Sequence, residues 1–328
     1  MTDAARFQPP RLLRNPHLQS VLGASGLRRL RGERALASSG ATTREQILDG
    51  GHGVRLQGWH SQVPGRHRRG TALLLHGWEG SAESAYMRLA AACLLADGLD
   101  VVRLNFRDHG GSHHLNEGLF HSNRIDEIVD AVRVVAARWP IQPLFAAGYS
   151  LGGNFALRLA LRAHSHGLPL QRAVAVCPLL DPARTMDAME AGLPLYMRYF
   201  ERKWRGSLAR KRELFPQAHG FDDGVLRLRM RALTEWMVLR HTGFASLDDY
   251  WNGYSVAGER LRALSIPVEI LMAADDPVIP LREFEAIAGF PNVQVELAAH
   301  GGHCGFIENA KLDGYAERWV AKRLIASR

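Results

Sequence analysis

The sequence contains little cysteine and no long hydrophobic run. Its three cysteines are Cys93, Cys177 and Cys304; they are too few and too scattered for a disulfide framework or a zinc site, and they suit a reducing compartment. No apolar stretch reaches the roughly 18 residues that a transmembrane helix needs, and the polar segment Met1–Pro10 lacks the pattern of a secretory signal. These absences predict a soluble, cytoplasmic protein.

Signatures of nucleic-acid binding are also missing, although the formal net charge is +8. The densest basic runs, Arg28–Arg34 and Arg198–Arg212, have no zinc-finger, helix-turn-helix or RNA-binding pattern around them. We therefore expect no nucleic-acid partner. The basic charge leaves open a weak peripheral contact with anionic membrane surfaces.

Short hydrophobic runs that alternate with helical patterns predict a parallel sheet. After an antiparallel hairpin around Asp49–Gly51, the runs lack the alternation of half-exposed strands, as expected for strands covered on both faces. Helical spacing is found in Ser84–Ala96 and in Arg124–Arg138, with Asn123 as the expected N-cap of the second. The apolar runs are Thr71–Leu75, Leu99–Phe106, Leu144–Ala147, Ala173–Cys177 and Val268–Ala273. This order predicts an α/β fold with a mostly parallel, doubly wound sheet and a ligand site at the carboxyl ends of its strands.

The alternation stops between residues 181 and 263, where the sequence becomes arginine-rich and aromatic with helical spacing. We expect this segment to be an inserted helical cap. Residues 1–180 then hold the N-terminal segment and the first part of the core. Residues 264–328 hold the rest of the core, with an alternating strand at Val293–Leu297 and a final helix.

Ser150 is the candidate nucleophile. It lies in a G-x-S-x-G motif, Gly148 to Gly152, between a buried strand and a helical pattern. A serine on a tight strand-to-helix turn needs neighbours with almost no side chain two residues away, and both positions are glycine. Because a serine hydroxyl alone is a weak nucleophile, the motif implies a base and a pair of oxyanion donors elsewhere.

The backbone N–H groups of Trp78 and Leu151 are the candidate oxyanion donors. Trp78 lies in the glycine-containing segment His76–Gly80, which follows the first buried strand, where this architecture places its second donor. Only the backbone of this segment is required to act. We therefore interpret His76 as structural.

Asp276 is the candidate acid. It lies in a proline-rich turn directly after the strand Val268–Ala273, where a carboxylate can hold an imidazole in the correct tautomer. Asp275 beside it is the first alternative. Asp181 is a third candidate, because it too follows a buried strand.

His303 is the candidate base. It lies deep in the glycine-rich loop that follows Val293–Leu297, whereas His300 is interpreted as a residue that orients this loop. The chain order of serine, aspartate and histidine is the one expected for a serine hydrolase on a parallel sheet. Two histidines three residues apart are also compatible with metal binding, but no fixed second cluster of ligands accompanies them, so neither a metal nor another cofactor is expected.

The sequence resembles the YheT-like α/β-hydrolases, relatives of the yeast medium-chain ester synthases and of mammalian lipid-acting members of the group. The resemblance depends on four segments: Asn15–Ser20, Gly148–Asn154, Asp275–Pro277 and Gly301–Phe306. Matched residue by residue, the nucleophile, acid and base of the family correspond to Ser150, Asp276 and His303. The resemblance implies esterase activity on short- to medium-chain acyl esters without a cofactor, with some members passing the acyl group to an alcohol.

The expected function is therefore a serine carboxylesterase that acts on a small-molecule acyl ester through an acyl-enzyme intermediate. Two alternatives use the same sequence features. An alcohol acyltransferase, or ester synthase, would replace water by an alcohol in the second step. A ligand-binding protein without catalysis would keep the α/β-hydrolase fold alone.

Overall fold

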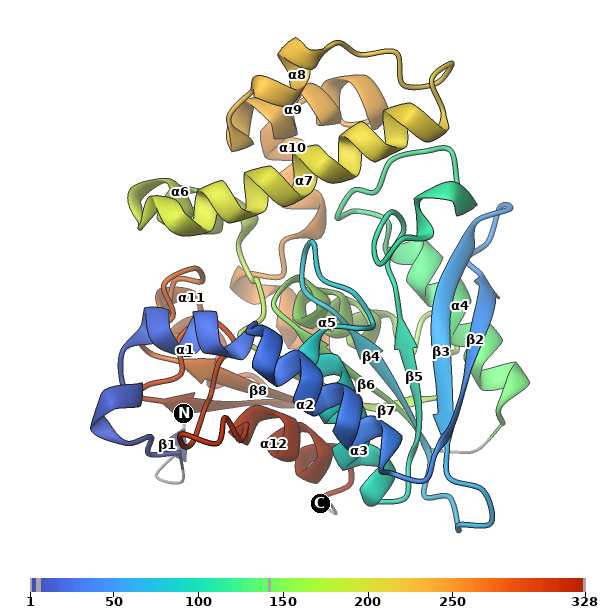
Figure 1. The fold of residues 1–328 in the computed structure, drawn as a ribbon, viewed down its shortest axis with the longest axis vertical. Coiled ribbons are helices and arrows are strands. Elements are labelled where there is room, and N and C mark those ends of the chain that lie inside the picture. Colours follow the sequence, from blue (N-terminus) through green and yellow to red (C-terminus); the bar gives the residue numbers. More distant parts are fainter. Residues whose placement is uncertain (1, 4–6, 141–142, 327–328) are drawn as a thin grey trace.

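A nine-stranded sheet forms the centre of the protein (Figure 1). The computed structural model describes residues 2–3, 7–140 and 143–326. The strands are β1 (Thr2–Asp3), β2 (Thr42–Asp49), β3 (Arg55–Gln62), β4 (Thr71–Leu75), β5 (Asp100–Leu104), β6 (Leu144–Tyr149), β7 (Leu170–Val176), β8 (Val268–Ala273) and β9 (Val293–Ala298). Their order across the sheet is β1-β9-β8-β7-β6-β4-β5-β3-β2.

Most neighbouring strands run parallel, as the sequence predicts. Strands β1, β9, β8, β7, β6, β4 and β5 form consecutive parallel pairs. Two pairs of the described strands are antiparallel: β2 with β3, the expected hairpin, and β3 with β5, which joins the hairpin to the rest of the sheet. Every residue of β4, β5, β6 and β8 is buried, which accounts for their mostly apolar sequence. The buried charged residues in them are Asp100, Arg103 and Glu269. The predicted α/β class is confirmed.

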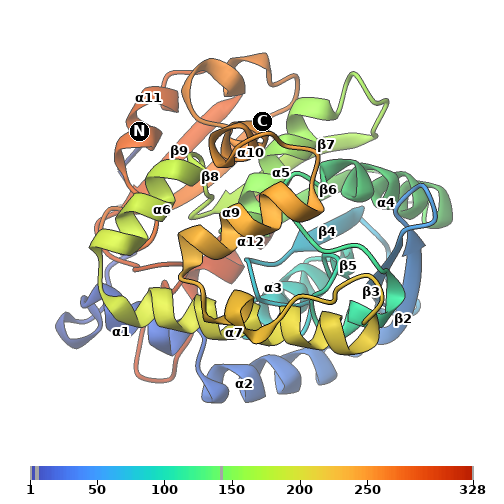
Figure 2. The same cartoon turned by 90° about the horizontal axis from the view of Figure 1, so that it is seen from above.

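Helices cover both faces of the sheet. Helix α5 (Leu151–Arg162) and helix α4 (Ile125–Arg138) lie on one face, and α3 (Ala85–Ala96) and α12 (Tyr315–Leu324) on the other (Figures 1 and 2). The short helix α11 (Arg282–Ile287) precedes β9. The connections from β4 through α3 to β5, and from β6 through α5 to β7, are the crossovers that the alternating pattern predicts.

One predicted helix cap is wrong. Asn123 does not cap α4, whose N-cap position is Arg124 without a side-chain hydrogen bond. The Asn123 amide instead donates to the backbone carbonyl of Tyr250, 2.8 Å away. The hydrogen bond to Tyr250 replaces the expected capping bond. A local sequence pattern does not reveal it, because the two residues are far apart in sequence.

The N-terminal part forms elements that the sequence patterns did not predict. A short 3-10 helix, η1 (Arg11–Leu13), is followed by α1 (Pro16–Gly23) and α2 (Gly26–Ala37). Asn15 caps α1, since its side chain accepts from the N–H groups of the second and third residues of the turn. Both helices lie on the α3 side of the sheet (Figure 2).

The segment between β7 and β8 is helical and lies above the carboxyl ends of the strands (Figure 1). It comprises α6 (Pro182–Ala191), α7 (Pro194–Leu214), α8 (Asp223–Arg227), α9 (Met230–His241), α10 (Leu247–Tyr254) and the 3-10 helix η3 (Gly258–Ala263). These helices agree with the predicted helical insertion. We refer to α6–α10 as the cap; the domain bounds 1–180, 181–263 and 264–328 stay predictions.

A buried ion pair holds the cap to the core. Lys211 of α7 donates to Asp108, which follows β5, over 2.7 Å, and their side chains are 1% and 5% exposed. The same ammonium also donates to the carbonyls of His113 and Asn116. Because all three hydrogens of the ammonium have acceptors, its burial is compensated. The loop after β5 is thereby fixed beneath α7.

The helices that the structure describes include none with the length and hydropathy needed to cross a membrane.

Candidate active site

The turn between β6 and α5 presents Ser150 above the sheet. Ser150 has φ 54° and ψ −119°, a strained conformation for a residue with a side chain. A Cβ atom added at Gly148 would lie 2.0 Å from the carbonyl oxygen of Gly152, and one added at Gly152 would lie 2.2 Å from that of Leu75. The tight turn therefore requires glycine at both positions, which is the physical basis of the G-x-S-x-G pattern.

His303 and Asp276 lie beside Ser150 although they come from different loops. The Nε2 atom of His303 is 2.9 Å from Ser150 Oγ, and its Nδ1 atom is 2.9 Å and 3.2 Å from the two carboxylate oxygens of Asp276. Asp276 follows β8 and His303 follows β9, so the ends of two adjacent parallel strands supply the pair. The three side chains form one continuous chain of hydrogen bonds.

The Asp276 carboxylate is rigidly held. Its side chain is fully buried, and its Oδ1 atom accepts from the backbone N–H groups of Val278 and Ile279 over 2.8 and 3.0 Å. These bonds come from the turn that the prolines create after β8. They leave Oδ2 facing the imidazole of His303, so the ring has one fixed orientation.

The alternative acids lie elsewhere. Asp275 accepts from the N–H of Gly302 over 2.9 Å and faces His300 at 3.5 Å, so this pair fastens the loop that carries His303. Asp181 caps α6 through the N–H of Arg184. Neither carboxylate contacts the His303 ring among the hydrogen bonds of the described residues.

The two expected oxyanion donors lie on either side of the serine. Leu151 is the first residue of α5, and the loop carrying Trp78 passes so close that a Cβ atom at Gly77 would lie 3.4 Å from Ser150 Cβ. Within the described residues, no backbone hydrogen bond uses the N–H of Trp78 or Leu151. Both groups are therefore available to a ligand at Ser150.

His76 has a structural environment. It is fully buried, its Nδ1 atom lies 2.8 Å from the Gly77 carbonyl, and its Nε2 atom accepts from the N–H of Phe106. Burial lowers the pKa of His76 well below its usual value, and the charge of nearby His109 lowers it further. The ring therefore stays neutral and ties the Trp78 loop to the neighbouring strand end.

The N-terminal helix α1 positions the loop that carries His303, a role that the sequence patterns did not reveal. Ser20 Oγ accepts from the backbone N–H of His303 over 2.9 Å and donates to the carbonyl of Pro16. The buried Gln19 side chain accepts from the N–H of Ile307 and donates to its carbonyl. The segment Asn15–Ser20 thus acts as a clamp on the loop, and its only signal in the sequence was the family resemblance.

An apolar cavity opens directly above Ser150. It encloses about 770 Å³, its open mouth included. Its floor is formed by Ser150, Leu151 and Trp78, and its upper walls come from four cap helices. The cap residues are Met186 and Met189 of α6, Phe200 and Trp204 of α7, Met237 of α9, and Tyr250, Trp251 and Tyr254 of α10. The cavity therefore suits an apolar group attached to the atom that Ser150 would attack.

Two opposing effects set the pKa of His303. Burial lowers it, but the adjacent Asp276 carboxylate, and after it the neighbouring Cys304 side chain, outweigh burial and raise the pKa to about 9. The neutral ring consequently has a strong affinity for a proton at Nε2, the atom that faces Ser150.

The serine lies on a strand-to-helix turn, and its imidazole partner comes from the end of a later parallel strand. Helices inserted between two strands of the sheet cover both residues. Together these features define a serine hydrolase of the α/β type. The profile of the alpha/beta hydrolase fold family matches residues 72–310, and the chain belongs to this family. The protein is an enzyme of the serine hydrolase class.

Known relatives agree with this placement and with the resemblance to YheT-like proteins. The putative esterase YheT of Escherichia coli is 28% identical over 98% of this chain and 93% of its own length. Phospholipase ABHD3 of mouse is 27% identical over 73% of this chain, and the match spans 59% of that protein. Among solved structures, the Pyrococcus furiosus esterase Pf2001 shares the fold with a TM-score of 0.56 at 17% identity, over 88% of this chain and 94% of that one.

Replacing Ser20 tests the clamp on the His303 loop. We expect Ser20→Ala to lower kcat about tenfold and to change KM less than about twofold, because the lost hydrogen bond orients the candidate base and does not contact the substrate cavity. Steady-state kinetics on an activated ester measures both constants. Ser20→Thr, which keeps the hydroxyl, should recover most of kcat.

Ser25→Ala is the matched control, since Ser25 caps α2 and makes no hydrogen bond to this loop. An equal fall of kcat in Ser20→Ala and Ser25→Ala, or an unchanged kcat in Ser20→Ala, would contradict a positioning role.

Proposed function

We propose that the protein hydrolyses carboxylic esters of short- to medium-chain acyl groups through an acyl-enzyme intermediate on Ser150. The single observation that carries the proposal is the continuous hydrogen-bonded chain from Ser150 Oγ through the His303 ring to the Asp276 carboxylate, at the floor of an apolar cavity. The relatives described above, a putative esterase and a phospholipase, support an ester as substrate.

The first step transfers the acyl group to the enzyme. His303 Nε2 takes the proton of the Ser150 hydroxyl as Oγ attacks the carbonyl carbon of the ester. The charge that develops on the carbonyl oxygen is stabilised by the N–H groups of Trp78 and Leu151. The carbon–oxygen bond to the alcohol then breaks, and the alcohol leaves with the proton from His303.

The second step returns the enzyme to its starting state. His303 removes a proton from a water molecule, whose oxygen attacks the acyl carbon, and the bond to Ser150 Oγ breaks as the serine regains its proton from His303. Asp276 keeps the Nδ1–H tautomer in place throughout. An alcohol in place of water would give a new ester, which is the alternative acyltransferase reaction.

The apolar cavity is the proposed acyl site. Its lining by methionine and aromatic side chains favours a flexible hydrocarbon chain, since methionine adapts to irregular shapes at little cost. The cap helices supply much of the cavity wall, which favours chains of limited length. The mouse relative named a phospholipase supports lipid-type acyl groups in particular.

We also propose a cytoplasmic location. Its support is the presence of three free cysteines, two of which have sulfur atoms within 4.8 Å of each other without a disulfide. Thiols in that arrangement persist in a reducing compartment.

A series of p-nitrophenyl esters of rising chain length tests the reaction and the acyl site. We expect activity to rise and then fall with chain length, and to fall at least about 10³-fold in Ser150→Ala, His303→Ala and Asp276→Ala, because each removes one member of the hydrogen-bonded chain. Ethanol added to the same assay separates hydrolysis from acyl transfer, through the ratio of free acid to ethyl ester.

The exposed Ser165, beyond the end of α5, provides the matched control. Ser165→Ala should keep the activity and the covalent labelling of the folded protein by a fluorophosphonate, whereas Ser150→Ala should lose both. Equal labelling of Ser150→Ala and wild type, without turnover of any ester, would favour the non-catalytic binding protein.

The raised pKa of His303 predicts an alkaline pH profile. Only the neutral ring accepts a proton, so activity is lost as pH falls below the pKa, which is about 9 in the free enzyme. We expect kcat/KM to rise about tenfold per pH unit from pH ~6 to ~8 and to level near pH ~9. Cys304→Ala should move the rise of kcat/KM to lower pH, because the Cys304 side chain contributes to the raised pKa of His303. If kcat/KM rose near the ordinary pKa of histidine in both proteins, the raised pKa of His303 would be contradicted.

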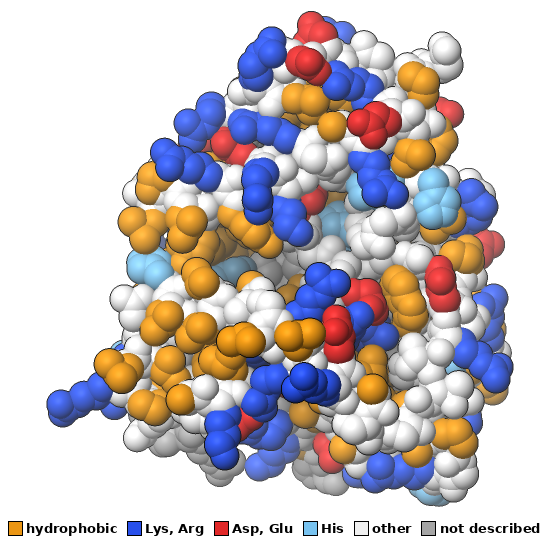
Figure 3. Space-filling model, viewed as in Figure 1, with side chains coloured by type: hydrophobic (Ala, Val, Ile, Leu, Met, Phe, Trp, Pro, Cys, Tyr) orange, Lys and Arg blue, Asp and Glu red, His pale blue; other side chains and the backbone are white. Residues whose placement is uncertain are grey.

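We further propose that a weak contact with anionic membrane surfaces uses one face of the protein. Helices α1 and α2 and the start of α7 lie on the same side of the molecule (Figure 2). Apolar side chains are exposed on η1 and on these helices, and apolar and basic side chains lie together on this side of the surface (Figure 3). We call this set the leucine face; it consists of Leu12, Leu18, Val21, Leu27, Leu30, Leu193, Leu195 and Tyr199. His17 of α1 and Tyr196 of α7 meet within it at 2.9 Å, next to the clamp on the His303 loop.

Cosedimentation with lipid vesicles tests the leucine face. We expect more binding to vesicles with anionic lipid than to neutral ones, with a loss of binding as salt rises. The double variant Leu27→Ser, Leu30→Ser should bind about tenfold less, because two half-exposed leucines no longer enter the interface. Ile47→Ser, an exposed apolar position on β2, is the control. Equal binding to both lipid types would refute the proposal.

A further inference from the structure

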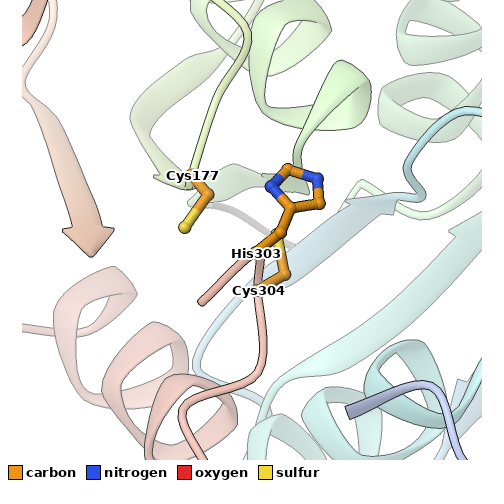
Figure 4. A group of neighbouring side chains, drawn as sticks. All are labelled: Cys177, His303 and Cys304. Carbon is orange, nitrogen blue, oxygen red and sulfur yellow. The ribbon is translucent and has the colours of Figure 1, made fainter. Parts of the chain in front are cut away.

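Two cysteines lie beside the candidate base, although the mechanism does not use them. The sulfur atoms of Cys177 and Cys304 and one ring nitrogen of His303 all lie within 4.8 Å of one another (Figure 4). Cys177 directly follows β7, and Cys304 directly follows His303. The fold therefore brings together two thiols that are far apart in sequence, contrary to the expectation that the cysteines are too scattered for a metal site.

The group is enclosed but open to the surface on one side. Cys177 is fully buried, whereas Cys304 and His303 are partly exposed. The partners of the two thiols are weak ones: Cys177 Sγ lies 3.9 Å from the carbonyl of Gly302, Cys304 Sγ lies 3.6 Å from that of Val176, and the two thiols also interact with each other. Both sulfur atoms can therefore turn toward a common ligand at little cost in lost hydrogen bonds.

We propose that Cys177, Cys304 and His303 form an inhibitory site for a thiophilic divalent cation of the zinc type. Thiolate sulfur and imidazole nitrogen are the donors that zinc prefers in proteins. Zinc–sulfur bonds of about 2.3 Å and zinc–nitrogen bonds of about 2.0 Å in a tetrahedron place the donor atoms roughly 3.5 to 3.8 Å apart. Separations within 4.8 Å need a movement of only about 1 Å to reach this range.

Three protein donors leave one position of the tetrahedron to a water molecule. Asp276 Oδ2 lies 2.9 Å from His303 Nδ1 but does not belong to the group of donor atoms within 4.8 Å of one another. Binding of the cation would release the protons of the two thiols, because cysteine binds zinc as thiolate. Two thiolates, one imidazole and one water form a normal donor set for zinc.

Occupation of the site stops the hydrolysis described above, and this consequence rests on the proposed function. Both ring nitrogens of His303 are engaged, Nε2 with Ser150 and Nδ1 with Asp276. A cation that takes either nitrogen breaks one of these two hydrogen bonds. The ring then either loses its proton-accepting atom or loses the carboxylate that orients it. Binding of the cation itself does not depend on catalysis.

Metal binding is tested first without reference to activity. Purified protein, stripped of metal with EDTA and kept reduced, is titrated with Cd²⁺, whose thiolate complexes absorb in the ultraviolet. We expect one equivalent of Cd²⁺ to give this absorption in wild type and in Cys93→Ala, the control for a thiol outside the site. Cys177→Ala and Cys304→Ala should each need at least about tenfold more Cd²⁺. Absorption that is the same in all four proteins would overturn the site.

Inhibition is tested with Zn²⁺ and with Mg²⁺ as the control cation. At zinc concentrations about ten times the dissociation constant, ester hydrolysis and fluorophosphonate labelling of Ser150 should both fall about tenfold and return with EDTA. Each cysteine variant, compared with its own metal-free rate, should need at least about tenfold more zinc. Thermal unfolding shows whether the variants fold. If Cys177→Ala does not fold, Cys304→Ala still provides the test, because Cys304 is partly exposed.

The outcomes separate this proposal from the proposed function. Thiol-dependent Cd²⁺ absorption in a protein that hydrolyses no ester would leave the metal site standing and refute the esterase. Ester hydrolysis that zinc inhibits equally in wild type and both cysteine variants would refute the metal site alone. Inhibition reversed by a phosphine reductant but not by EDTA would also overturn it, because that result indicates oxidation of the thiols.

Discussion

The hydrogen bond between His303 Nε2 and Ser150 Oγ is the contact on which the rest of the site depends, and it is held from both ends of the chain. Asp276 fixes the ring, while Ser20 fixes the backbone that carries it. A proton moves between two heavy atoms only when they are at hydrogen-bond distance, so a shift of 1 Å in the loop costs more than the loss of a surface contact. The N-terminal helix α1 is therefore part of the active site, although it offers no atom to the reaction.

The cap is also held in place by specific hydrogen bonds. Helices α6–α10 supply most walls of the apolar cavity, and polar contacts join them to the core. The buried pair of Lys211 and Asp108 and the bond from Asn123 to Tyr250 place two of these helices over the serine. A buried charge pair with every hydrogen satisfied adds little net stability but excludes other arrangements, because any shift would leave a charge unpaired. The cap is thus positioned by polar contacts and shaped by apolar ones.

The sequence identifies candidate site residues where the relevant physics is local. Ser150 and Asp276 are chosen because each lies in the turn after a buried strand, and parallel strands bring their carboxyl ends to one edge. The choice of His303 over His300 is matched by the geometry, since only His303 faces the serine. The roles of Ser20 and Gln19 could not be derived, because their partners lie at the opposite end of the chain and nothing in a helical pattern specifies them.

Loops that meet at one edge of a sheet bring their side chains together whatever the chemistry of those side chains. The loops after β7 and β9 must approach each other so that an imidazole can reach the elbow, and whatever residues flank that imidazole are brought together with it. Small aliphatic residues at these positions would be inert. In this chain the positions are Cys177 and Cys304, and two thiols beside an imidazole bind soft cations whether or not the enzyme benefits. The packing that places His303, the proposed base, beside Ser150 therefore also places it where a metal can bind it.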